Sequence, residues 1–219
     1  MRRITAIEPQ KNPQRVNVYL DGEFAFGLAR IVAAWLKVGQ ELSEEKIAAL
    51  QAEDAREEVY QKALRFLSYR PRSAAEVRQN LSKHGVPEAL IEATLERLQR
   101  SGLVDDEAFA RLWVENRSEF RPRSRSALRA ELRRKGLAEE IIQSVLEQSE
   151  DEETLALQAA RKYVRRLKGL EWPEFRRKMG GFLARRGFYY SMIAPLISQV
   201  WKEMQAENGG ETSHDEDDR

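Results

Sequence analysis

A short pattern recurs three times along this chain at an interval of 51 residues, and no other feature constrains the fold as strongly. In each copy a leucine precedes a glycine by four residues, and two apolar residues stand five and six positions after it. The three glycines are Gly85, Gly136 and Gly187. The apolar residues around them have helical spacing, so each copy predicts a unit of three helices that buries its apolar face against its neighbours. We therefore expect a mainly α fold in which three tandem three-helix repeats form an elongated array.

The helix boundaries inside the first copy agree with this prediction. Ser73 and Glu76 have the spacing of a capping box, which marks the start of a helix. Gly85 stands where a left-handed residue would end that helix, and Pro87 suits the first turn of the next one. The copy therefore contains separate helices and not one long helix.

The block Arg-Pro-Arg-Ser occupies residues 70–73 and recurs 51 positions later at residues 121–124, whereas the third copy has Glu-Trp-Pro-Glu at residues 171–174. A helix start explains the proline and the serine. It does not explain the two arginines, because cations are slightly unfavourable at the positive end of a helix. Paired arginines beside helix N–H groups suit a phosphate or a carboxylate. The sequence leaves a purely structural role and an anion-binding role about equally open.

The N-terminal segment differs from the rest of the chain. Residues 16–27 alternate apolar and polar side chains around Asp21 and Gly22, which predicts a β-hairpin with its turn at that dipeptide. Residues 3–7 are expected to add a third strand, because an isolated hairpin is only marginally stable. The next expected elements are two short helices, at residues 28–36 and 43–51.

These patterns together predict five parts of the chain. The last part is expected to be disordered, because it lacks apolar residues and is rich in acids. The parts are a β-hairpin segment with short helices (1–54), three repeats (55–104, 105–151 and 152–206) and an acidic tail (207–219).

The charges nearly cancel over the whole chain, with a formal net charge of +1, but they are segregated along it. Residues 117–136 hold eight bases and two acids, and residues 161–187 hold ten bases and two acids. Residues 139–153, in contrast, hold seven acids and no base. A run of charge is usually a solvated helix face, but such segregation of sign favours a basic surface that meets nucleic acid or an acidic protein. Tyr189 and Tyr190 follow a glycine outside the core spacing and are candidates for stacking on bases.

The sequence offers no support for catalysis. It contains no cysteine, no phosphate-binding loop and no pair of metal-binding histidines, since His84 and His214 are its only histidines. The carboxylates lie in surface runs and not singly on apolar faces, so no acid–base pair can be nominated. We expect no catalytic residue, no metal and no cofactor. No apolar stretch approaches the roughly 20 residues of a membrane span, and no signal peptide precedes the hairpin, so we expect a cytoplasmic protein without a membrane partner.

Several segments, in this order and spacing, resemble the RecX family of bacterial recombination regulators over about residues 4–204. The segments are residues 7–10, 20–24, 63–73, 102–110 and 128–136. The resemblance is weaker in the third copy, which lacks the Arg-Pro-Arg-Ser block.

The resemblance implies a non-enzymatic regulator built from three tandem three-helix units. Members of the family bind the filament that the RecA recombinase forms on single-stranded DNA, lying along its groove. They restrain filament growth and inhibit the ATPase, strand-exchange and coprotease activities. The implied partners are the RecA filament and the single-stranded DNA within it, the latter through contacts to phosphates.

Arginines and lysines of the basic segments are our candidates for the surface that faces this partner. They are Arg70, Arg72, Arg121, Arg123, Arg133, Arg134, Lys135, Arg185 and Arg186. Replacing Arg121, Arg123, Arg133 and Arg134 together with serine is expected to weaken filament inhibition without unfolding the chain.

Two other functions remain open on the sequence alone. The chain could bind DNA nonspecifically without a recombinase, in which case its affinity for naked DNA would fall steeply with salt. It could also be a helical scaffold for an acidic partner. A stronger effect on the protein–DNA filament than on either component alone would distinguish the regulator from both.

Overall fold

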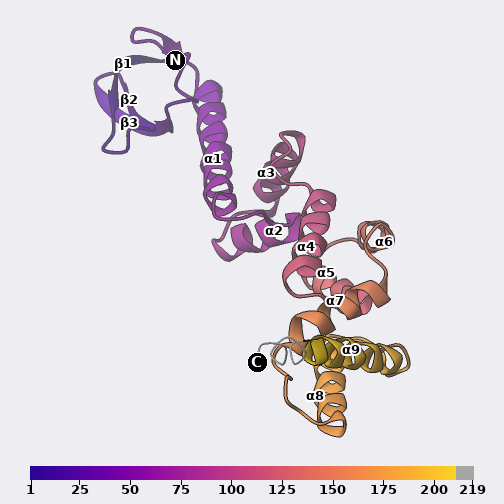
Figure 1. Ribbon diagram of the computed structural model, residues 1–219. Coiled ribbons are helices and arrows are strands. Elements are labelled where there is room, and N and C mark those ends of the chain that lie inside the picture. Colours follow the sequence, from indigo (N-terminus) through magenta and orange to yellow (C-terminus); the bar gives the residue numbers. More distant parts are fainter. Residues whose placement is uncertain (211–219) are drawn as a thin grey trace, which may run out of the picture. The chain divides into compact units, whose positions relative to one another are not determined.

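A computed structural model describes residues 1–210 of the chain in two compact units, the first comprising Met1–Asp105 and the second beginning at Asp106 (Figure 1). Of the expected acidic tail, residues 207–210 belong to the last helix, and residues 211–219 lie outside the described part. None of the helices in residues 1–210 combines the length and apolar character needed to cross a bilayer.

The first unit begins with an antiparallel sheet of four short strands in the order β3-β2-β1-β4. The strands are β1 (Arg2–Pro9), β2 (Arg15–Leu20), β3 (Glu23–Ala29) and β4 (Glu41–Leu42). Asp21 and Gly22 connect β2 to β3 with positive φ angles of 55° and 91°, as a tight two-residue hairpin turn requires. The predicted hairpin and the predicted third strand are therefore confirmed.

The short helix expected at residues 28–36 is wrong. Leu28 and Ala29 pair with β2 as the end of β3, and residues 30–35 form consecutive turns instead of a helix. Backbone bonds tie the far end of this segment to the sheet, since Gly39 N donates to Ile4 O (2.8 Å) and Ile4 N donates to Gln40 O (2.9 Å). Because the sheet holds both ends of the segment, its backbone forms turns in place of a regular helix.

The second expected short helix is the first third of a 24-residue helix, α1 (Glu44–Leu67), which Ser43 caps by accepting a hydrogen bond from Lys46 N. The expected boundary between residues 54 and 55 thus falls inside α1. Asp54 explains why the N-terminal part of this helix belongs with the sheet (Figure 1). Its carboxylate accepts a hydrogen bond from Ala29 N (2.5 Å) and pairs with Arg15 (2.8 Å).

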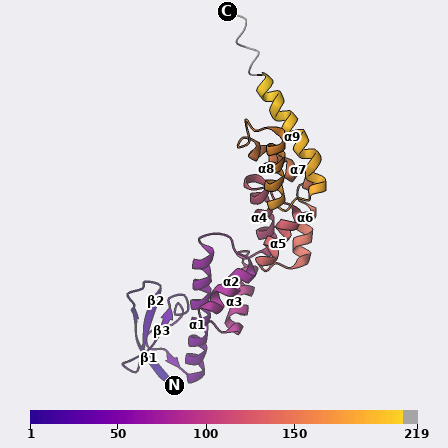
Figure 2. The same ribbon diagram turned by 90° about the horizontal axis from the view of Figure 1, so that it is seen from below.

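Eight further helices follow α1, and the nine helices of the described residues form three groups of three. Repeat 1 consists of the C-terminal part of α1 with α2 and α3, repeat 2 of α4–α6, and repeat 3 of α7–α9 (Figure 2). Each repeat has a hydrophobic cluster of its own, as does the sheet. The eight helices are α2 (Ala74–Lys83), α3 (Glu88–Arg100), α4 (Asp106–Phe120), α5 (Arg125–Arg134), α6 (Glu139–Glu147), α7 (Glu152–Val164), α8 (Trp172–Arg185) and α9 (Tyr190–Gly210).

The second helix of every repeat ends in the same backbone geometry, which we call the glycine corner (residues 84–86, 135–137 and 186–188). Gly85, Gly136 and Gly187 have φ angles of 72°, 77° and 91°. Each glycine N–H bonds to the carbonyl three residues earlier (2.9 Å), and the next N–H bonds to the leucine carbonyl five residues earlier (3.2–3.3 Å). This is the Schellman motif, and its three occurrences confirm the predicted repeat.

Gly187 also permits close packing between repeats 2 and 3. A Cβ atom at this position would overlap Ser124 Oγ and stand 3.0 Å from Ala127 Cβ, in the first turn of α5. Nothing lies within 4 Å of the corresponding point at Gly85. The same local conformation thus has an additional steric role in the third copy.

A buried carboxylate organises repeat 2. Glu131 of α5 is only 7% exposed and accepts hydrogen bonds from Trp113 Nε1 and Arg117 Nε, both 2.8 Å long. Its other oxygen pairs with Arg123 at 3.0 Å. Asp54 and Glu57 of α1 are similarly buried. The expectation that all carboxylates lie in surface runs is therefore wrong.

The surroundings of Glu131 change its pKa in two opposing directions. Burial by itself raises the pKa, because it penalises the charged form. The hydrogen bonds from Arg117 and Trp113 and the charges of Arg117 and Arg123 outweigh burial, so the pKa lies below its ordinary value. Glu131 therefore stabilises the fold in its ionised form.

Replacing Gly187 with alanine is expected to destabilise the chain more than replacing Gly85. Both variants force an L-residue into the left-handed region, which costs about 1–2 kcal/mol. Gly187→Ala adds overpacking against Ser124 and Ala127, typically another 1–3 kcal/mol. Urea unfolding followed by circular dichroism measures both, and equal losses would contradict the close packing at Gly187.

Glu131→Gln is expected to lower the free energy of unfolding at pH 7 by about 1–3 kcal/mol, because it weakens hydrogen bonds from charged donors. A depressed pKa stabilises the fold above the unfolded value of about 4.3, and this contribution is lost as pH falls through the folded value. The difference between wild type and variant should therefore shrink on acidification. Urea titrations at a series of pH values test this, with the exposed Glu115→Gln as a control that changes stability by less than about 0.5 kcal/mol.

Candidate nucleic-acid interface

The candidate site lies in the second unit, where the glycine corner of repeat 3 meets the start of α5. Arg186 Nη1 donates to Pro122 O (2.8 Å), and Ser124 N donates to Arg186 O (3.1 Å). Ser124 also caps α5 by accepting a hydrogen bond from Ala127 N (3.1 Å). The chain segment before α5 is thus fixed by both the side chain and the backbone carbonyl of Arg186 in repeat 3.

Three guanidinium groups meet at this position, and we call Arg121, Arg123 and Arg186 the corner cluster. Arg186 is half-buried, with its guanidinium 4.6 Å from the centre of the Phe182 ring. Burial lowers the pKa of Arg186 from its ordinary value, and the charges of Arg123 and Arg121 lower it further. Glu131 compensates Arg123, so the cluster keeps an excess of positive charge that favours an anion.

The corresponding block in the first unit is built differently. Arg70 Nη2 pairs with Glu76 (2.9 Å), the same glutamate that closes the capping box with Ser73. The Arg72 guanidinium lies over the Phe66 ring at 4.2 Å, and its Nε is buried without a hydrogen-bond partner within residues 1–210. Here the two arginines are largely engaged inside the fold.

The remaining candidates lie at the ends of α5 and α8. Arg133 pairs with Glu139 (2.7 Å), and Lys135 lies 4.8 Å from the Trp113 ring centre. Arg134 and Arg185 are exposed, and their side chains have no ion pair or hydrogen bond among the described residues. The same holds for Arg121, so three of the nine candidates are unengaged.

The structure thus brings together three of the predicted residues and adds others that the sequence analysis missed. Arg117 and Trp113 hold Glu131, and the Arg117 guanidinium lies 4.5 Å from the Trp113 ring centre. Glu131 directly precedes the buried Leu132 and follows the buried Leu128 by three residues, which places it on the apolar face of α5. The position of this acid on the apolar face of an otherwise basic helix was the sequence feature that could have indicated its burial.

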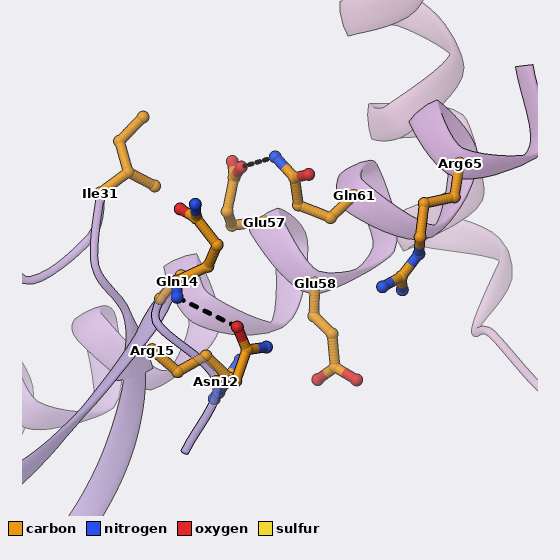
Figure 3. Close-up of a pocket in the computed structure, with 9 residues that line it drawn as sticks. Asn12, Gln14, Arg15, Ile31, Glu57, Glu58, Gln61 and Arg65 are labelled. Atoms are coloured by element: carbon orange, nitrogen blue, oxygen red, sulfur yellow. Dashed lines mark hydrogen bonds between the residues drawn. The ribbon is translucent and has the colours of Figure 1, made fainter. Parts of the chain in front are cut away.

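A polar pocket of about 510 Å³ lies in the first unit, between the segment around Asn12 and the middle of α1 (Figure 3). Glu57 and Glu58 both line it (Figure 3). Glu57 accepts hydrogen bonds from Gln61 (2.8 Å) and Arg97 (2.7 Å), and Glu58 pairs with Lys62 (3.3 Å). Both carboxylates of the pocket are therefore already paired with cations. The described residues also contain no group of three or more acidic or histidine side chains that could hold a metal ion.

Family models match the chain along most of its length. The model of the regulatory protein RecX N-terminal domain matches residues 2–43. The models of the first, second and third three-helix domains of RecX match residues 60–98, 105–146 and 150–197.

Curated relatives and solved structures agree with the family models. The regulatory protein RecX of Bacillus pumilus is 32% identical over 212 residues, which cover 94% of this chain and 81% of that protein. The RecX protein of Limosilactobacillus reuteri is 33% identical over 206 residues, covering 91% and 77%.

A crystal structure of a regulatory protein RecX superposes with a TM-score of 0.71 at 31% identity, covering 90% of this chain and 98% of that one. The crystal structure of RecX from Lactobacillus salivarius has a TM-score of 0.58 at 23% identity, covering 68% and 97%, and agrees in fold. Four matched domains in the same order and this level of identity show that the chain belongs to the RecX family of regulatory proteins.

Proposed function

We propose that this chain regulates a RecA-type recombinase by binding the filament that the recombinase forms on single-stranded DNA, and that it inhibits the ATPase, recombinase and coprotease activities of that filament. It acts by binding and has no catalytic activity of its own. Family membership supports the regulatory role, and the surface of the second unit supports the mode of binding.

The observation that carries the proposal is the recurrence of one module at a fixed interval. Repeats that share the glycine corner place the same backbone module at a fixed interval along the chain, and a filament has a regular repeat of its own that such a chain can follow. The excess positive charge of the corner cluster suits the phosphates of the DNA within such a filament. Nine basic residues remain proposed contacts, and the unengaged Arg121, Arg134 and Arg185 are the strongest among them.

A second candidate function is nonspecific DNA binding without a recombinase, which the same cluster supports. The two functions differ in the form of DNA on which the chain acts. A DNA-binding protein binds naked strands with a steep salt dependence, whereas the filament regulator affects recombinase-coated strands at lower concentration than naked ones.

The structure also sharpens the choice of variant. Removing Arg123 would leave the buried Glu131 with one arginine fewer, and removing Arg133 would break its pair with Glu139. A fourfold serine variant that includes both would thus mix lost stability with lost binding. Arg121 and Arg134 make no such pairs within residues 1–210 and are cleaner targets.

Arg121→Ser/Arg134→Ser is expected to raise the concentration needed to inhibit the single-stranded-DNA-dependent ATPase of RecA by roughly tenfold or more, since hydrogen bonds to charged groups contribute about 1.5–3 kcal/mol each. The control, Lys62→Ser/Arg111→Ser, removes equal charge from two exposed intrahelical ion pairs and should leave inhibition nearly unchanged. Unchanged inhibition in the first variant would refute the assignment of these contacts. No inhibition by the wild-type chain would refute the proposed function itself.

A further inference from the structure

Two adjacent tyrosines stand exposed at the start of α9. The side chains of Tyr189 and Tyr190 are 68% and 62% exposed, although the next turns of α9 bury Ile193 and Ile197 completely or nearly so. Rings this exposed bury little apolar surface in the fold, and neither belongs to the hydrophobic cluster of repeat 3. Their position therefore has to be explained by something outside this repeat.

A comparison of the repeats shows that the module does not need these tyrosines. In repeats 1 and 2, a glutamate at the first residue of the third helix pairs with an arginine of the second helix. The pairs are Arg78–Glu88 and Arg129–Glu139. In the same register, repeat 3 has Gly180 and Tyr190. The ion pair that joins the second and third helices in repeats 1 and 2 is thus absent from repeat 3, where a small residue and an exposed aromatic ring take its place.

Arginines lie near the tyrosines. Arg176 Nη2 donates to Tyr190 Oη (2.8 Å) and so restrains that ring. Arg185 and Arg186 lie four and three residues before Tyr189, and three residues of chain span at most about 11 Å between Cα atoms. The Cα atom of Tyr189 is therefore within about 11 Å of that of Arg186, a member of the corner cluster.

The acids nearest in sequence do not neutralise this region. Glu203 of α9 pairs with Arg161 (2.9 Å), and Glu174 of α8 pairs with Lys178 (2.9 Å) and stands 3.9 Å from Arg177. Exposed aromatic rings next to guanidinium groups suit a ligand that has flat rings and negative charge at regular spacing. A single-stranded nucleic acid has both properties, whereas the base pairs of a duplex hide the ring faces.

We propose that Tyr189 and Tyr190 form a stacking platform for unpaired bases of a single strand whose phosphates lie against the corner cluster. The inference deepens the proposed function and rests on it for the biological role, since it identifies how the same surface distinguishes single strands from duplexes. The arginines supply affinity for any phosphate backbone, and the tyrosines supply the preference for unpaired bases.

The test uses the full chain without any recombinase. Fluorescence anisotropy measures binding to a labelled oligothymidylate and to a hairpin duplex with the same number of nucleotides. Wild-type protein should bind the single strand with a Kd in the range of about 10⁻⁶–10⁻⁴ M. Tyr189→Ala/Tyr190→Ala should weaken that binding by roughly tenfold or more and leave duplex binding unchanged.

Two further variants separate stacking from other roles. Tyr189→Phe/Tyr190→Phe keeps the rings without the hydroxyl groups and should retain single-strand affinity. Trp35→Ala removes an aromatic side chain that is 88% exposed in the first unit and should have no effect. Circular dichroism verifies that all variants are folded.

Several outcomes would overturn the proposal. They are absence of single-strand binding by the wild type at about 10⁻⁴ M, an unchanged affinity in the double alanine variant, an equal loss for the duplex, or an equal loss in Trp35→Ala. The binding assay contains no recombinase, so its result can be interpreted even if the chain does not regulate the filament. The ATPase experiment can likewise be interpreted even if the tyrosines do not stack on bases.

Discussion

The left-handed glycine that ends the second helix of each repeat is the constraint on which the rest of the structure depends. Only at this backbone conformation do the two Schellman hydrogen bonds form, and they fix the direction in which the third helix leaves. A side chain would strain every one of the three corners. At Gly187 it would also separate α5 from repeat 3, because Ser124 and Ala127 occupy the space that a Cβ would need.

Once the corner is fixed, the surface of each repeat can change independently of its interior. Each repeat has its own hydrophobic cluster, so replacing a surface ion pair does not disturb a neighbouring core. Arg129 and Glu139 close repeat 2 with charge, whereas Gly180 and Tyr190 at the same register expose a ring in repeat 3. Because the repeats share one backbone architecture but differ in their surface residues, one chain can present a different surface in each repeat.

The features that the sequence predicted correctly are local. The glycine corner of each repeat, the capping box at Ser73 and the hairpin turn at Asp21 depend on residues within a few positions of one another. The helix expected at residues 28–36 failed because distant strands anchor both of its ends. The length of α1 and the burial of Glu131 likewise depend on partners far along the chain, such as Arg15 and Trp113, which no local pattern identifies. The corner cluster could not be predicted from local patterns either, because Arg186 contacts Pro122, which lies 64 residues earlier in the chain.

The distinction between engaged and unengaged arginines explains why only part of the basic sequence is available for the contacts that we propose. Arg117 and Arg123 form ion pairs with the buried Glu131. Removing that carboxylate would increase the repulsion among the guanidinium groups at the corner. Arg121 and Arg186 have no such counterion in the described residues, and their mutual repulsion, together with burial, disfavours the charged form of Arg186. A phosphate placed there would reduce this repulsion, which is the physical reason why the proposed site favours an anion. The same carboxylate that stabilises repeat 2 therefore limits the site to the arginines it leaves unpaired.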